Sequence, residues 1–137
     1  MSLFDVFGVA GSALTAQKVR LNTIASNLAN SETAASSPER TYKAKSAVFQ
    51  AVLDQELGSQ GVTAVKVIGI AEDQTPPRRQ YSPQDPIADE QGYIYLPNIN
   101  AVEEMSNMMS ASRSFQINVE LMNTSKELLM RTLSIGK

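Results

Sequence analysis

The sequence contains neither cysteine nor histidine. The first absence excludes disulfides, thiolate nucleophiles and sulfur-ligated metals, and the second removes the commonest general base and metal ligand. Carboxylates remain, but the acidic pairs at 72–73, 89–90 and 103–104 are sequence neighbours, and adjacent side chains point apart on a helix or a strand. We therefore expect no catalytic residue, no metal site and no cofactor, and we predict that the protein is not an enzyme.

An excess of basic charge is also lacking. Twelve lysines and arginines stand against fourteen acidic residues, and Arg78 and Arg79 form the only adjacent basic pair. Nucleic-acid binding needs a concentrated basic surface, so no nucleic-acid partner is expected. No apolar run approaches the ~18 residues that span a bilayer, which excludes direct membrane insertion. The first twenty residues lack a secretory signal, so we expect a cytoplasmic protein or export by a route without such a signal.

Residues 3–30 are predicted to form one helix. Apolar residues recur at alternating steps of four and three, proline is absent, and only Gly8 and Gly11 weaken the first turns. Asn30 is the expected helix end, with a left-handed backbone and a side-chain amide bonded to a freed carbonyl. Seven of the eight positions in this row are apolar, and the row is Leu3, Phe7, Ala10, Leu14, Gln17, Leu21, Ile24 and Leu28.

The last stretch predicts a second long helix. Pro97 stops the preceding segment, Asn98 or Asn100 can cap the new helix, and Gly136 lies at its expected end. Eight of ten positions at the same spacing are apolar, and the row is Ala101, Met105, Met108, Ser112, Phe115, Val119, Met122, Lys126, Leu129 and Leu133.

Helices of about 42 Å and 55 Å do not fit a compact globule of this length, whose radius of gyration is ~14 Å. We therefore predict an elongated, antiparallel, coiled-coil-like pair formed by the two termini. Second apolar rows stay uncovered in such a pair and are typical of partner surfaces. Within one subunit the row Leu14, Leu21, Ile24 and Leu28 is expected to pack against Met105, Phe115, Val119 and Met122, whereas Val6, Ala13, Ile117, Leu121 and Leu128 are expected to meet adjacent subunits.

The middle of the chain is predicted to hold little regular structure. Residues 31–41 read as a loop, and residues 42–57 as either a short helix or an extended arm. β-Branched residues predict a strand at 62–73, and four prolines between 76 and 86 make that region largely irregular. A short strand at 93–97 is expected to place Tyr93 and Tyr95 on one face. The predicted fold is mainly α with a small β-containing insertion, in which 1–31 and 98–137 form a discontinuous helical domain and 32–97 a middle domain.

Two segments carry a family resemblance. "LNTIASNLANSET" resembles the amino-terminal signature of the bacterial flagellar rod and hook proteins, and "NINAVEEMSNMMSASRSFQINVELMNTSKELL" resembles their carboxyl-terminal signature. "YSPQDPIADEQGYIYLPNIN" resembles the proximal-rod type, except that Asp85 stands where that type tends to have histidine. We expect Asp85 to cap a turn beside Pro86 rather than to bind a metal.

The resemblance implies a structural subunit, exported through the flagellar type III apparatus, that polymerises into the drive shaft crossing the periplasm and transmits motor torque. It implies a homo-oligomer within a helical rod, located in the flagellar basal body. The implied partners are the other proximal-rod proteins, the adaptor to the membrane ring and export gate, and the distal rod protein. An alternative is a helical-hairpin adaptor or chaperone in the cytoplasm. Four polar residues at matching positions join the expected assembly interface: Asn27, Asn30, Arg113 and Asn118. For Asn27 and Asn30, simple helix capping without an intersubunit bond is the other possibility.

Overall fold

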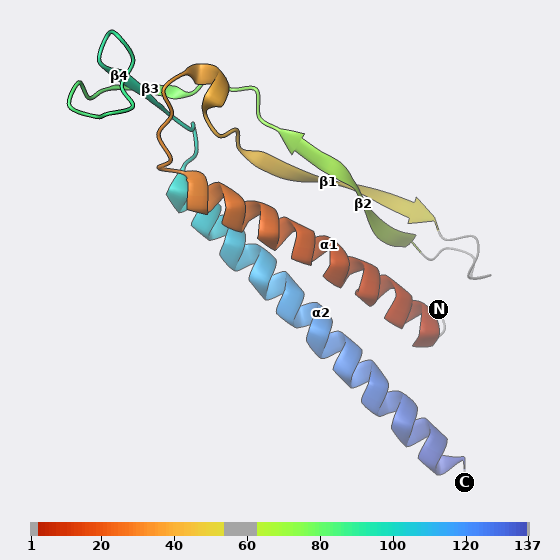
Figure 1. The fold of residues 1–137 in the computed structure, drawn as a ribbon. Helices are drawn as coiled ribbons and strands as arrows, with labels where there is room; N and C mark the ends of the chain where they lie inside the picture. Colours follow the sequence, from red (N-terminus) through yellow and green to blue (C-terminus); the bar gives the residue numbers. More distant parts are fainter. Residues whose placement is uncertain (1–2, 54–62, 137) are drawn as a thin grey trace. The chain divides into compact units, whose positions relative to one another are not determined.

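The computed structural model describes residues 3–53 and 63–136. Along the chain, one long helix comes first, small β elements follow, and a second long helix comes last (Figure 1). The mainly α layout with a β-containing insertion is therefore confirmed, whereas the coiled-coil pairing of the helices stays a prediction. The elements are α1 (Leu3–Asn30), the 3-10 helix η1 (Pro38–Arg40), β1 (Lys45–Leu53), β2 (Thr63–Glu72), β3 (Arg78–Tyr81), β4 (Tyr93–Leu96) and α2 (Ala101–Ile135).

The helix α1 ends at Asn30, as the sequence predicted. The side-chain Nδ2 of Asn30 donates a hydrogen bond to the carbonyl of Ser26 at 2.8 Å. This carbonyl lies one turn back inside α1, so it is not one of the carbonyls that the helix end frees. The expected left-handed backbone is wrong, because Gly92 is the one described residue with a positive φ. At the helix end the carbonyl of Leu28 accepts the backbone N–H of Ser31 at 3.3 Å, and that of Asn30 accepts the backbone N–H of Thr33 at 3.1 Å. The chain therefore leaves the helix without a left-handed residue.

The helix α2 begins directly after Asn100, whose Oδ1 accepts the backbone N–H of Val102 at 3.1 Å and of Glu103 at 3.4 Å. Asn100 is thus the N-cap, which decides between the two asparagines that the sequence offered. The helix ends at Ile135, immediately before Gly136, as predicted.

The strands form two separate two-stranded sheets, β1 with β2 and β3 with β4. The strand β1 shows that the ambiguous segment is extended over residues 45–53, and residues 54–57 of that segment lie outside the described residues. The strands β2 and β4 confirm the two predicted strands. The strand β3 corrects the sequence reading of an irregular region: it pairs antiparallel with β4, with Arg79 opposite Tyr95 and Tyr81 opposite Tyr93. The prolines lie on either side of β3, so none interrupts its hydrogen bonds.

The chain divides into two compact units. The first comprises Met1–Leu21, Val48–Gly69 and Ser110–Lys137, and the second comprises Asn22–Ala47 and Ile70–Met109. Both helices contribute to both units, so the predicted domain boundaries at 31 and 98 stay a prediction. The buried apolar residues of the first unit are all alanines, namely Ala10, Ala16 and Ala111, and Asp5 and Ser125 are buried with them. The second unit buries larger apolar residues, namely Ile24, Ile94, Leu96, Pro97 and Ile99.

Candidate functional site: the Asn27 cluster and the exposed helix rows

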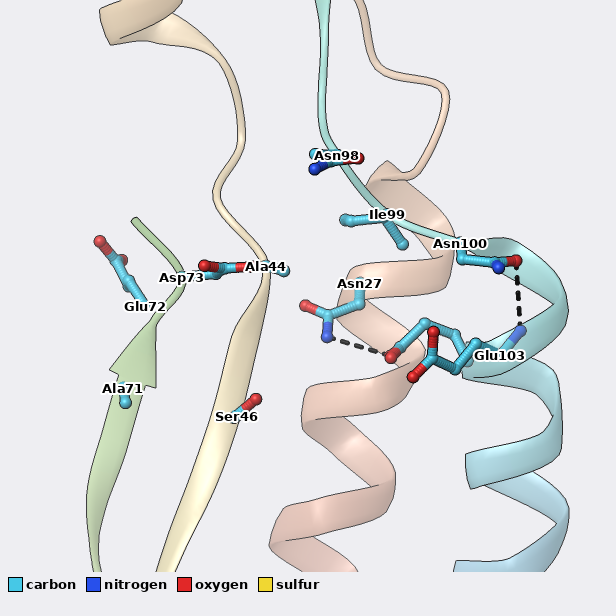
Figure 2. Close-up of a pocket in the computed structure, with 11 residues that line it drawn as sticks. Asn27, Ala44, Ser46, Ala71, Glu72, Asp73, Asn98, Ile99, Asn100 and Glu103 are labelled. Carbon is cyan, nitrogen blue, oxygen red and sulfur yellow. Dashed lines mark hydrogen bonds between the residues drawn. The ribbon is translucent and has the colours of Figure 1, made fainter. Parts of the chain in front are cut away.

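Asn27 lies in the last turns of α1 and is only 3 % exposed. Its Nδ2 donates to the backbone carbonyl of Lys45 at 2.8 Å and to Oε2 of Glu104 at 3.0 Å. Its Oδ1 accepts the backbone N–H of Lys45 at 2.8 Å and the hydroxyl of Tyr42 at 3.1 Å. Within the second unit, one side chain therefore joins the end of α1 to the start of β1 and the start of α2. Figure 2 shows Asn27 and its bond toward α2.

The amide of Asn27 carries the same donor and acceptor as a peptide group. It bonds to both backbone groups of Lys45 at once, as a neighbouring strand would. Burial raises the pKa of Tyr42, and the negative charges of Glu104 and Glu72 raise it further. Tyr42 thus stays protonated and serves as a hydrogen-bond donor to Asn27.

A polar cleft of about 380 Å³ adjoins this cluster in the second unit (Figure 2). Its lining contains no basic side chain. Within residues 3–53 and 63–136, no group of three acidic residues has the arrangement of a metal site. The polar lining consists of Asn27, Ser46, Glu72, Asp73, Asn98, Asn100, Glu103 and Glu104.

The β3–β4 hairpin carries an ordered aromatic face. The rings of Tyr81 and Tyr93 meet edge to face at a centroid separation of 5.2 Å, and the Arg79 guanidinium lies 4.4 Å from the centre of Tyr93. Asp89 accepts the backbone N–H of Tyr93 at 2.8 Å and the hydroxyl of Tyr95 at 3.0 Å. The hydrogen bond from the Tyr93 backbone is the main cause of the lowered pKa of Asp89, which keeps the carboxylate ionised.

Asp85 caps a turn, as predicted from the sequence. Its Oδ1 accepts the backbone N–H of Ile87 at 3.1 Å, across Pro86. This bond is the Asx turn that a short acidic side chain forms two residues ahead. The departure from histidine at this position therefore leaves a turn that Asp85 itself stabilises.

Along α2, the residues that the folded chain buries or half-buries form a row, which we call the protected row. It shares every second residue with the apolar row predicted from the sequence, and its other residues lie one position earlier. Met108, Phe115, Met122 and Leu129 are shared by both rows and are half-buried. Met105 is 52 % exposed and Val119 is 36 % exposed in the single chain, so their intrachain packing stays a prediction. The protected row is Glu104, Met108, Ala111, Phe115, Asn118, Met122, Ser125 and Leu129.

The other predicted packing positions, on α1, are largely protected. Ile24 is buried, and Leu14, Leu21 and Leu28 are half-buried. This is the pattern expected of a packed row, although the partner row assigned to it stays a prediction.

The predicted assembly residues divide by exposure. Ile117, Leu121 and Leu128 are 59 %, 46 % and 51 % exposed, so a neighbour can contact them. Arg113, one helical turn before Ile117, is exposed as well. The side-chain amide of Asn27, in contrast, makes its hydrogen bonds within the chain. The remaining assembly residues, all half-buried, are Val6, Ala13, Asn30 and Asn118, the last of which donates to the Ser114 carbonyl at 2.9 Å.

Sequence reasoning missed the partners of Asn27. Tyr42 and Lys45 lie in a segment without clear periodicity, and the period of α2 places Glu104 beside the predicted row instead of in it. No local signal links these residues, because they meet only when separate elements pack together. No helix in the described part of the chain has the length and apolar character that crossing a membrane requires.

Two family models match the ends of the chain. The model described as "Flagella basal body rod protein" matches residues 7–34. The model described as "Flagellar basal body rod FlgEFG protein C-terminal" matches residues 90–135. The matched residues include most of α1 and all of α2.

Full-length relatives decide the family. The chain is 45 % identical to the flagellar basal-body rod protein FlgC of Salmonella typhimurium over the whole of both chains. It is 44 % identical to FlgC of Yersinia enterocolitica and 36 % identical to FlgC of Bacillus subtilis, again with both chains fully covered. The chain belongs to the FlgC family of basal-body rod proteins. A FlgC-type chain is a structural subunit of the flagellar basal-body rod and not an enzyme, and it assembles with other rod components.

Proposed function

We propose that this FlgC-type subunit polymerises through the exposed apolar rows of α2 into the proximal part of the rod, the drive shaft that transmits torque across the periplasm. The observation that carries the proposal is the exposure of Ile117, Leu121 and Leu128 on one long helix. Contiguous exposed apolar side chains of this kind mark an interaction surface. The expected neighbours are further copies, the other proximal-rod proteins, the adaptor to the membrane ring and export gate, and the distal rod protein.

Polymer formation explains why a folded chain leaves such rows open. Burying a leucine or isoleucine side chain completely is worth about 1.5–3 kcal/mol, so each half-exposed side chain contributes roughly 1 kcal/mol when a neighbour covers it. A single chain lacks this stabilisation, and each neighbour that covers some of these side chains adds part of it. Export without a cleaved signal through the flagellar type III apparatus would deliver the subunit to the growing rod.

The test is a substitution of Leu121 by aspartate in motile cells whose own copy of the gene is replaced. The expected result is loss of rods and of swimming with normal secretion of the variant, because a buried unpaired carboxylate is strongly unfavourable in an interface. Normal swimming of Leu121→Asp cells would sink the proposed interface.

The matched control is Ser106→Asp, which places the same side chain on an exposed polar position of the same helix. These cells should build rods and swim. Ser59, which the sequence places in an exposed loop, lies outside the described residues and is less suitable as a control. Equal loss of motility in both variants would point to a general defect of the helix instead of an interface.

A further inference from the structure

Methionine supplies all the sulfur in this chain, because the sequence has six methionines and no cysteine. Five of the six lie on α2. Two-electron oxidants attack thiolates and the thioether of methionine. The helix α2 therefore carries nearly all the sulfur atoms on which such an oxidant can act.

Burial divides these five methionines into two classes. Met105, Met109 and Met130 are 52 %, 73 % and 62 % exposed, whereas Met108 and Met122 are half-buried and belong to the protected row. An oxidant has to reach the sulfur atom before it can react. The first three methionines are accessible in the folded single chain, and the other two become fully accessible only when the chain opens locally.

The exposed methionines of the second unit lie away from its polar cluster. Glu104, the neighbour of Met105, accepts the Asn27 amide at 3.0 Å. Met105 and Met109 are four residues apart and share a flank of α2 with Val102, which is 72 % exposed. A change confined to this flank therefore alters the surface of the helix and leaves the Asn27 cluster intact.

The reaction adds one oxygen atom to the thioether. With hydrogen peroxide, the methionine sulfur attacks one peroxide oxygen, the S–O bond forms as the O–O bond breaks, and the other oxygen leaves as water. Sulfur loses the two electrons that the peroxide gains. Hypochlorous acid gives the same product with release of chloride and a proton. The product is a polar sulfoxide in place of an apolar thioether, and methionine sulfoxide reductases reverse the change.

We propose that Met105, Met109 and Met130 are reversible oxidation sites, at which hydrogen peroxide or hypochlorous acid converts the folded, unassembled subunit into a form that does not enter the rod. The loss of assembly rests on the proposed function of α2, since a sulfoxide on an apolar surface loses its water when a neighbour covers it. The fold of the single chain does not change, because the new polar groups stay in water.

Peptide mass spectrometry of the purified full-length chain tests the sites. In hydrogen peroxide under native conditions, the three exposed methionines should each gain one oxygen at least about fivefold faster than Met108 and Met122. The difference should vanish in concentrated urea, and circular dichroism should show the same thermal midpoint before and after the exposed sites have reacted. Equal rates in the folded chain, or unfolding that accompanies the first three oxidations, would overturn the proposal.

Substitutions in motile cells test the effect on assembly. Glutamine resembles methionine sulfoxide in size and polarity, whereas leucine is close to methionine in volume and is not oxidised. The triple variant Met105→Gln, Met109→Gln and Met130→Gln should be secreted normally and should reduce the number of rods at least about tenfold. The matched triple variant with leucine should build rods in normal number. Normal rod numbers in the glutamine variant would refute the effect on assembly.

The leucine variant also provides the control for oxidation in growing cells. After a sublethal dose of hypochlorous acid, parent cells should build fewer new rods, and cells with the leucine variant should continue to build them. The oxidant reaches the other proteins of both strains equally, so the difference reports on these three methionines. Equal loss in both strains would overturn the proposal and leave the rod function standing, whereas rods built in cells without the protein would refute the rod function itself.

Discussion

Replacing Asn27 by alanine removes the side chain that joins three elements of the second unit. Four hydrogen bonds disappear at once: two with the backbone of Lys45, one with Tyr42 and one with Glu104. Each is worth about 0.5–1.5 kcal/mol net, and a buried group left unpaired costs more. Because Lys45 and Glu104 are half-buried, water replaces part of the loss. We expect a destabilisation of about 3 kcal/mol.

That loss is large beside the 5–15 kcal/mol that typically stabilises a domain. Urea unfolding followed by circular dichroism measures it directly. With a denaturant dependence of about 1–3 kcal/mol per molar, the midpoint should fall by about 1–3 M. Amide hydrogen exchange gives a local reading, because the Lys45 N–H loses its acceptor and should exchange much faster than in the parent chain.

Asn30→Ala is the matched control. Asn30 lies one turn further along α1, and its exposed side-chain bonds are local: it donates to the Ser26 carbonyl at 2.8 Å and accepts the Thr33 hydroxyl at 3.5 Å. Its removal should change stability by no more than about 0.5 kcal/mol and leave Lys45 protected. The reasoning fails if the two alanine variants lose equal stability, or if the Lys45 amide stays protected in Asn27→Ala.

Three smaller predictions concern single groups. Gln17→Leu should stabilise the chain by about 1 kcal/mol in thermal unfolding, because Gln17 Oε1 is buried without a partner among the described residues and the change removes its desolvation cost. The hairpin should loosen as pH falls below the unfolded carboxyl pKa of about 3.9 and through the lower folded pKa of Asp89. Tyrosine fluorescence should follow this change and Asp89→Asn should abolish it. Gly92→Ala should destabilise the hairpin in amide exchange, because its φ is +81° and a Cβ would lie 3.0 Å from the Tyr81 ring.

Helix ends were predictable because their signals are local. Asn100 caps α2 through its own side chain, and Asn30 bonds four residues back along α1. The strand β3 was not predictable in this way. Its sequence, Arg-Arg-Gln-Tyr, has no apolar alternation, and it becomes a strand by pairing with β4. Tertiary contact, and not local preference, determines such a segment.

The position of the protected row on α2 shows a second limit. Counting apolar residues favours Met105 and Val119, whereas the folded chain protects Glu104, Ala111 and Ser125. Small side chains such as those of Ala111 and Ser125 allow neighbouring elements to approach closely. A count of hydrophobic residues does not detect this effect, because it depends on side-chain size. A helix that serves both its own chain and its neighbours carries several apolar rows, and periodicity alone does not distinguish them.

An assembling subunit has to hold its own elements together while it keeps apolar side chains for its neighbours. This chain meets the requirement with polar contacts of fixed geometry. In the second unit Asn27 binds both backbone groups of Lys45, and in the first unit Ser12 Oγ accepts the backbone N–H of Val65 at 3.1 Å. Directional bonds of this kind set the position of β1 and β2 on α1 without consuming apolar surface. With polar bonds in these places, the exposed apolar side chains of α2 remain available for the assembly that we propose.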